Sequence, residues 1–149
     1  MPRPSPPDLV LVGLQSVLLA GVLFAPAPFA VSVPGAWRLG FTAVKYLAVG
    51  FGAVAALQLG SGLTPWPTPR AGARLVTTGV FALVRHPIYA ALLALCFASA
   101  LASGSPVRLL FALALFVLIR RKVRYEEGLL ARRYADYAAY AKRVKRFGV

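Results

Sequence analysis

Four apolar runs, separated by polar or turn-forming segments, dominate the hydrophobic pattern of this chain. The first three approach the roughly 20 apolar residues that a transmembrane helix needs. The fourth is shorter, but Arg108 and Arg120 near its ends can extend their charged groups toward lipid headgroups. The runs are Leu9–Ala25, Phe41–Leu59, Pro87–Ser103 and Val107–Ile119. The pattern predicts an all-α integral membrane protein with about four transmembrane helices.

The first run also fits a second interpretation. Arg3 precedes it and Ala25-Pro26-Ala27 follows it, as in a signal peptide with its small-residue cleavage site. Because three more apolar runs follow, we interpret Leu9–Ala25 as the first membrane helix. The chain is then one domain over residues 1–149, in which residues 1–74 hold two membrane helices and residues 75–149 hold a helical hairpin and a C-terminal helix.

Two segments between these runs are predicted to be loops. Pro26–Leu39 contains three prolines, and Gly60–Arg74 is rich in glycine and proline. Each segment carries one tryptophan, Trp37 or Trp66, a residue type that is frequent where a membrane meets water.

The third and fourth runs are predicted to form an antiparallel hairpin. Only Gly104-Ser105-Pro106 separates them, and this is a tight-turn sequence. The start of the third helix and the end of the fourth therefore lie at the same membrane face. This arrangement brings Arg85-His86-Pro87-Ile88-Tyr89 close to the acidic pair Glu126-Glu127.

The segment after the fourth run has a helical pattern from Lys122 to about Val144. Apolar and aromatic residues repeat there at three- and four-residue steps, which is typical of an amphipathic helix. The residues on this face are Glu126, Leu130, Tyr134, Tyr137, Ala141 and Val144. Glu127 lies about 100° away from that face. We expect this C-terminal helix to fold against the cytoplasmic end of the bundle.

Composition and charge support a membrane protein and give it an orientation. Of the 149 residues, 59% are hydrophobic, and the net charge is +13. Ten of the 17 basic residues lie in Arg120–Arg146, whereas the predicted opposite face carries only Arg38 and Arg108. By the positive-inside rule, both termini and the polar cluster are cytoplasmic. Nucleic-acid binding is the weaker interpretation of the charge, because no recognition motif accompanies it.

The polar cluster suits a zwitterionic ligand. Arg85 can bind a carboxylate or phosphate, and His86 can donate, accept or transfer a proton. Glu126 and Glu127 can accept hydrogen bonds from an ammonium group. Aromatic side chains such as Phe81, Tyr134 and Tyr137 can surround a ring or a cationic sulfonium. One histidine and two adjacent glutamates make a poor ligand set, so no metal site is predicted.

Each of these residues also has a purely structural interpretation. Arg85 and His86 can be interfacial residues at a helix start, and Glu126 can pair with neighbouring arginines on a solvated helix. The tyrosines can form an interfacial belt, and the single cysteine, Cys96, can be a small buried hydrophobic residue.

Two segments together resemble the isoprenylcysteine carboxyl methyltransferase family, whose pattern the related phospholipid amine methyltransferases share in a looser form. The first segment is Leu75–Tyr89, which includes Arg85-His86-Pro87-x-Tyr89. The second is Glu126-Glu127 followed by Leu130, Tyr134, Tyr137, Tyr140 and Arg143-Val144. The resemblance covers about half of the chain, from Leu75 to Phe147. The family often has glycine at the position of Ala91, tyrosine at Phe81 and proline at Lys145.

The resemblance implies S-adenosylmethionine as the methyl donor. By that resemblance, His86 and Tyr89 hold the amino-acid end of the donor, and Glu126 and Glu127 serve its ammonium group. Arg85 orients a carboxylate and, with Glu127, belongs to the catalytic centre. The remaining residues implied to contact the donor or its approach are Thr77, Gly79, Phe81, Pro87, Leu130, Tyr134 and Tyr137.

The resemblance also implies a lipophilic methyl acceptor that enters from the bilayer. An isoprenylcysteine carboxylate is one such acceptor, and a lipid amine or a lipophilic thiol is another. Two alternatives remain at this point. One is an NADPH-dependent membrane reductase of the sterol-reductase type, although Ile88 stands where those enzymes usually have asparagine. The other is a non-enzymatic basic membrane anchor.

Overall fold

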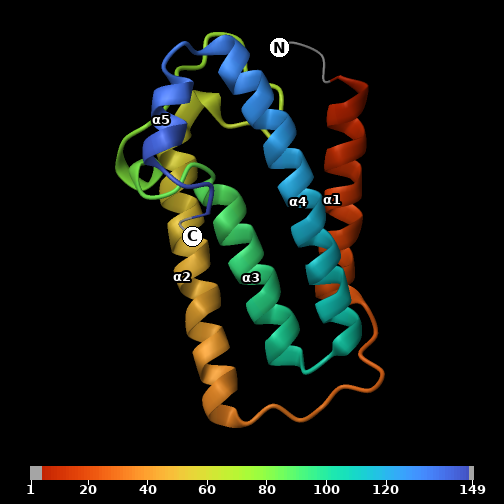
Figure 1. Cartoon of the computed structure of the whole chain (residues 1–149). Helices are drawn as coiled ribbons and strands as arrows, with labels where there is room; N and C mark the ends of the chain where they lie inside the picture. Colours follow the sequence, from red (N-terminus) through yellow and green to blue (C-terminus); the bar gives the residue numbers. More distant parts are fainter. Residues whose placement is uncertain (1–4, 148–149) are drawn as a thin grey trace.

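A computed structural model describes residues 5–147, and every regular element in that range is helical (Figure 1). Arg3, part of the charge argument above, lies outside the described residues. The elements are α1 (Pro6–Phe24), α2 (Gly35–Leu59), the short 3₁₀ helices η1 (Gly60–Gly62) and η2 (Gly79–Ala82), α3 (Pro87–Ser103), α4 (Pro106–Arg133) and α5 (Tyr137–Arg143). The predicted all-α class is confirmed for this part of the chain.

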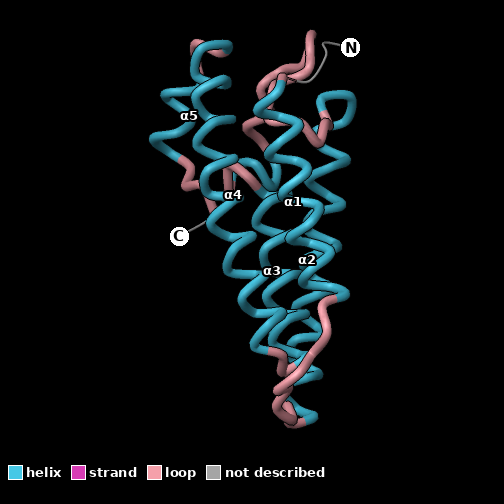
Figure 2. Tube along the Cα trace, turned by 90° about the vertical axis from the view of Figure 1, so that its right-hand side faces the viewer, coloured by secondary structure: helices cyan, strands magenta, loops and turns pink. Residues whose placement is uncertain are grey.

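The four long helices lie side by side in one elongated bundle (Figures 1 and 2). Helix α3 packs against α2, α4 and α1, and α1 also packs along α4. The core between α1, α3 and α4 includes Val22, Leu93, Cys96, Leu115 and Ile119, all of which are buried. The start of α1, the end of α4 and helix α5 lie at one end of the bundle, at the top of Figure 1.

Two of the helices are long and apolar enough to cross a membrane by length and composition. They are α1 and the stretch Gly35–Gly62, while α3 is equally apolar but shorter. Large apolar side chains such as Leu47 and Leu57 are exposed on α2. An exposed apolar surface of this kind suits contact with lipid rather than water.

The turn between α3 and α4 is the predicted tight hairpin, and it explains why the two helices are antiparallel. Gly104 adopts a left-handed conformation with φ of 63°, which glycine reaches without strain. Ser105 caps α4 by accepting a hydrogen bond from the Arg108 backbone amide, and Pro106 begins the helix. The backbone amide of Val31 donates to the carbonyl of Gly104 at 3.0 Å, which ties the α1–α2 loop to this turn.

The loop predicted over Pro26–Leu39 is shorter than expected. Helix α2 begins at Gly35, so Trp37 and Arg38 lie in its first turn. No proline follows Pro34 in this segment, so helical hydrogen bonding can begin directly after it. The apolar run used for the prediction began only at Phe41 and so left out the polar and interfacial residues of the first turn.

The prediction of one C-terminal helix from Lys122 to Val144 is wrong. Helix α4 continues without interruption to Arg133, and the chain then becomes extended at Tyr134 before α5 begins at Tyr137. The Tyr134 hydroxyl donates to the backbone carbonyl of Ala73 at 2.7 Å. This tertiary contact accompanies the break in a pattern that would otherwise support a continuous helix.

Candidate active site

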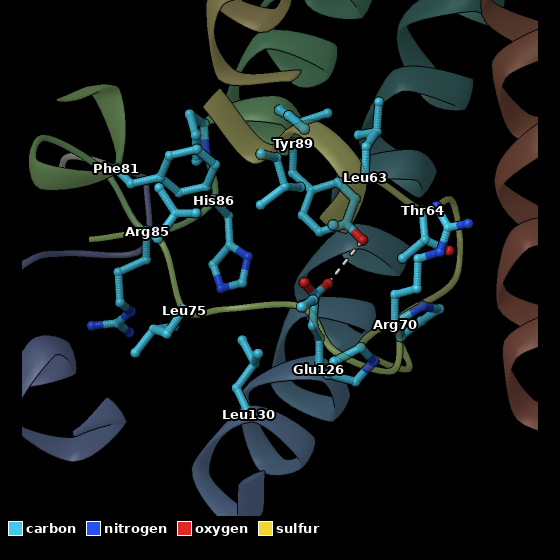
Figure 3. Close-up of a pocket in the computed structure, with 18 of the residues that line it drawn as sticks. Leu63, Thr64, Arg70, Leu75, Phe81, Arg85, His86, Tyr89, Glu126 and Leu130 are labelled. Atoms are coloured by element: carbon cyan, nitrogen blue, oxygen red, sulfur yellow. Dashed lines mark hydrogen bonds between the residues drawn. The ribbon is translucent and has the colours of Figure 1, made fainter. Parts of the chain in front are cut away.

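The hairpin brings the two polar segments into direct contact, as its geometry predicts. The Tyr89 hydroxyl donates to Glu126 Oε2 at 2.9 Å (dashed line in Figure 3). Arg85 Nη2 donates to Glu127 Oε1 at 2.8 Å, and His86 Nε2 lies 3.3 Å from the same oxygen. The N-terminal end of α3 and the C-terminal half of α4 therefore share one polar centre.

Glu127 is the anionic centre of this cluster. Besides Arg85 and His86, it accepts from Arg146, whose Nη2 lies 2.6 Å from Glu127 Oε2. Burial disfavours the charged carboxylate, but the hydrogen bonds with His86, Arg146 and Arg85 outweigh that effect. The pKa of Glu127 therefore lies well below its usual range, and the carboxylate is ionised at neutral pH.

The segment that follows α5, residues 144–147, forms a strap across the start of α3. The backbone amides of Arg85 and His86 donate to the carbonyls of Lys145 and Arg146 at 2.9 and 3.1 Å. The Arg85 guanidinium also donates to the carbonyls of Ala141 and Val144. Arg85 thus binds both Glu127 and the end of α5, which fixes the C-terminal segment to the bundle.

A cavity of about 430 Å³ lies beside this cluster. Its walls come from the end of α2, the segment between α2 and α3, the first turns of α3, the C-terminal half of α4, and α5, with one residue from α1. Nine of the site residues expected from the sequence line it: Phe81, Arg85, His86, Pro87, Tyr89, Glu126, Leu130, Tyr134 and Tyr137. Figure 3 shows His86 and Tyr89 on one side of the cavity and Glu126 and Leu130 on the other.

Three of the expected site residues do not line the cavity: Thr77, Gly79 and Glu127. Glu127 lies behind Arg85 and His86, and Thr77 precedes η2. Gly79 has φ of 60°, and the next amide, that of Val80, donates to Gln58 Oε1 at 3.0 Å. Gly79 thus allows the turn that places Phe81 on the cavity wall.

Glu126 is the carboxylate that faces the cavity. Burial raises its pKa above the usual range, and this is partly opposed by His86, the Tyr89 hydrogen bond and Lys122. The Tyr137 side chain lines the same cavity, and its buried hydroxyl meets the geometric criteria for no hydrogen bond among the described residues, although burial and the nearby Glu127 carboxylate raise its pKa. A ligand that offers a cation to Glu126 and a polar atom to Tyr137 would therefore satisfy both groups.

Part of the cavity wall could not be predicted from the motifs. The segment between α2 and α3 contributes Leu63, Thr64, Trp66 and Arg70, while α1 contributes Gln15 and α4 Lys122. The Thr68 hydroxyl, in that same segment, donates to Asp8 Oδ2 at 2.7 Å and so ties the wall to the start of α1. The only signal in the sequence was the position of Lys122, four residues before Glu126 on one helix face.

The family model described as phospholipid methyltransferase matches residues 17–137. The chain belongs to the phospholipid methyltransferase family. This family is related to the isoprenylcysteine carboxyl methyltransferases, so the resemblance seen in the two motifs is confirmed. No curated protein matched the chain.

Membership in the phospholipid methyltransferase family makes methyl transfer the general activity of this fold. The matched range includes the Arg85–Tyr89 segment and the Glu126-Glu127 pair, and it ends where α5 begins. Together with the long apolar helices, the family indicates a membrane protein. Ala91, which stands where the family often has glycine, packs against Gly52 of α2. A Cβ added to Gly52 would lie 3.1 Å from the Cβ of Ala91.

Proposed function

We propose that this protein is an integral membrane methyltransferase that moves a methyl group from S-adenosylmethionine to a lipophilic acceptor. The observation that carries the proposal is the cavity beside Glu126, which combines one inward-facing carboxylate with an aromatic and apolar lining. The family supplies the reaction class. The identity of the methyl donor and the class of the acceptor are our proposals.

The residues of the cavity suit the donor in size and in chemistry. A volume of about 430 Å³ falls in the ~300–1,000 Å³ range of pockets for small molecules and cofactors. Glu126 can accept the ammonium group at the amino-acid end, and the unpartnered Tyr137 hydroxyl is available to a polar atom of the ligand. Phe81 and Tyr134 can place aromatic faces beside a cationic sulfur.

When bound, S-adenosylmethionine supplies an electrophilic methyl group on a sulfonium. The residues of this chain then act by positioning, because an in-line displacement needs no protein nucleophile. Tyr89 orients Glu126 through its hydroxyl. Arg85 and Glu127 hold the strap over the start of α3, which keeps α5 in place as a wall that excludes water. Arg85 and Glu127 are thus proposed to maintain the site rather than to contact the donor.

The proposed acceptor is a lipid that reaches the cavity from the bilayer. The family name favours a phospholipid amine, and the isoprenylcysteine carboxylate or another lipid-like carboxylate, amine or thiol are alternatives within the same reaction. Apolar side chains such as Leu59, Leu63 and Leu92 line the cavity. They can surround the part of an acyl or prenyl chain nearest to its reactive group.

We further propose four membrane spans with the cavity on the cytoplasmic side. Helix α3, with 17 residues, is nearly as long as α1, with 19, and both α3 and α4 pack against α1 in the bundle (Figure 1). The basic residues Arg70, Arg74 and Arg85 and those of residues 120–146 lie at the cavity end, whereas Arg38 and Arg108 lie at the other end. This asymmetry supports a cytoplasmic cavity and cytoplasmic termini.

Isothermal titration calorimetry of the purified protein tests the proposal directly. The protein in uncharged detergent is titrated with S-adenosylhomocysteine, the demethylated product of the donor, and separately with NADPH. Micromolar binding of the first ligand alone supports the methyltransferase. Binding of NADPH alone would instead support a reductase, and binding of neither by folded protein would leave a non-enzymatic anchor.

A further inference from the structure

Lys122 brings a buried ammonium group to the cavity wall formed by α1 and α4. Its side chain is 1% exposed, and it lines the same cavity as Glu126. Its Nζ donates to Gln15 Oε1 at 2.7 Å and to the backbone carbonyl of Pro65 at 3.1 Å. The centroid of the Tyr89 ring lies 5.2 Å from Nζ. The ammonium group is therefore held in place from three sides.

None of these three neighbours carries a full negative charge. Within residues 5–147, every ion pair involves Glu127, and Lys122 takes part in none. The carboxylates of Asp8 and Glu126 are near enough to favour the ammonium form of Lys122, but neither forms a hydrogen bond or ion pair with it. Asp8 Oδ2 accepts from Ser5 and Thr68, and Glu126 Oε2 accepts from Tyr89. Buried cations in proteins are normally paired with an anion, because desolvation of an unpaired charge is costly. An anionic ligand group would supply the missing counter-charge.

Lys122 and Glu126 place one basic and one acidic side chain on the wall of the same cavity. The two residues are four positions apart on α4 and so lie on one helix face, with Glu126 closer to the C-terminal end. Tyr89 contacts both, with its ring near Lys122 and its hydroxyl on Glu126. Arg85, the cation that the motif suggested for a ligand carboxylate, already binds Glu127 and two backbone carbonyls.

We propose that Lys122 forms an oxyanion subsite, which binds a carboxylate or phosphate oxygen of a ligand beside the cation-accepting Glu126. The inference rests on the proposed function and refines it. Two ligands of that reaction carry such an oxygen: the donor, at its amino-acid end, and an acceptor with an anionic headgroup. Both present the same chemistry to Lys122, a charge-assisted hydrogen bond.

Matched pairs of probes test the subsite by calorimetry in uncharged detergent. S-adenosylhomocysteine is compared with its carboxamide, which lacks the negative charge, and dihexanoyl phosphatidate is compared with dihexanoylglycerol. We expect the wild-type protein to bind the anionic member of at least one pair about tenfold more tightly, equivalent to about 1.4 kcal/mol. Lys122→Met, which replaces the ammonium with an apolar group of similar length, should abolish that preference.

Two further variants make the test specific. Lys142→Met removes an exposed lysine from α5 and should leave the preference unchanged, which controls for the general positive charge of the protein. Lys122→Gln keeps a hydrogen-bond donor without the charge, and it serves if Lys122→Met does not fold. Folding of each variant is checked by size-exclusion chromatography and thermal unfolding.

The outcomes separate the two sources of the oxyanion. Loss of preference in the first pair alone assigns the subsite to the donor carboxylate, and loss in the second pair alone assigns it to the acceptor headgroup. The proposal is overturned if the wild-type protein prefers neither anionic probe, or if the preference persists in the folded Lys122 variants. A wild-type protein that does not bind S-adenosylhomocysteine contradicts the proposed function, whereas the lipid pair still tests the subsite.

Discussion

Two adjacent carboxylates on α4 have opposite electrostatic environments. Glu127 accepts from Arg85 and Arg146 and is held ionised by them, whereas Glu126 is buried beside the cavity with the Tyr89 hydroxyl as its donor. Residues one position apart on a helix point about 100° apart. This difference makes Glu127 a structural anion and leaves Glu126 available to a cationic ligand.

Glu126→Gln should weaken binding of S-adenosylhomocysteine about tenfold or more, because a charge-assisted hydrogen bond contributes ~1.5–3 kcal/mol. Burial raises the pKa of Glu126, so at low pH its proton must leave before the carboxylate can pair with an ammonium group. Wild-type affinity should therefore increase as the pH rises through that pKa, and the variant should lose this dependence. Calorimetry between pH 5 and pH 8 measures both effects.

Asp136→Asn is the matched control for this experiment, because Asp136 is an exposed acid just before α5. The control should keep wild-type affinity and pH dependence. The groups that influence Glu126, namely His86, Tyr89, Lys122 and Glu127, are unchanged in both variants. Equal affinities for wild type and Glu126→Gln at every pH would show that Glu126 does not contact the ligand.

The motifs in the sequence predicted which residues would meet, but not which of them would face the cavity. The proximity of Tyr89 to Glu126 follows from two antiparallel helices joined by a short turn. The burial of Lys122 could not be predicted, because it stands in a run of basic residues that is typical of a solvated segment. Its partners Gln15 and Pro65 are 107 and 57 residues away, and no local pattern records such contacts.

Among the structural elements, the strap of residues 144–147 depends on a single carboxylate. Glu127 links Arg85 at the start of α3 to Arg146 in the strap. The backbone pairing of Arg85 with Lys145 adds a contact that does not depend on charge. The strap should therefore loosen, rather than unfold the bundle, when the carboxylate is removed.

Glu127→Gln should increase hydrogen–deuterium exchange of the amides in residues 141–147. We expect exchange about tenfold faster than in the wild type at neutral pH, because the nearly buried Arg85 and the more exposed Arg146 lose their shared anion (about 1.4 kcal/mol per factor of ten). Exchange of the α3 amides around Cys96, which lies in the buried core, should remain unchanged. Unaltered exchange in residues 141–147 would mean that backbone pairing alone holds the strap.

The pH dependence of this difference follows from the lowered pKa of Glu127. Its contribution is fully present above the pKa of an unfolded glutamate, ~4.3, and it decreases as the pH falls below that value toward the lower pKa of the folded state. The wild type and Glu127→Gln should thus differ by a constant factor from pH 5 to pH 8. The difference should decrease progressively below pH 4.

The break between α4 and α5 shows where a sequence pattern stops being informative. The apolar spacing from Glu126 to Val144 continues through Tyr134 without a proline, and its one glycine, Gly128, lies within α4 and not at the break. The extended conformation at Tyr134 coincides with its hydrogen bond to Ala73, 61 residues earlier. A periodic pattern predicts a helical preference, and a distant contact can override it.

At the scale of the whole molecule, most basic residues of the described chain lie at the end that holds the cavity. The long helices connect this end with the Gly104 turn at the other (Figures 1 and 2). Arg38 and Arg108 lie at the opposite end, where basic residues are few. This asymmetry supports a single orientation in the membrane.

Labelling of single cysteines tests this orientation in intact cells. A membrane-impermeant maleimide should label Arg38→Cys without permeabilisation, and Lys142→Cys only after permeabilisation. Both positions are exposed, and the native Cys96 is 1% exposed, so its own labelling should be low. The unmodified protein is the control, and the reverse labelling pattern would place the cavity on the outer side.

The dependence of the cavity on the strap has a consequence for how the protein is made. Tyr137 and Tyr140 of the cavity wall follow all four long helices in the chain. Arg85 and His86 meet their backbone partners only after Arg146 has left the ribosome. The binding site can therefore be completed only at the end of synthesis, and a chain interrupted after α4 would lack one wall of the cavity and the strap that holds it.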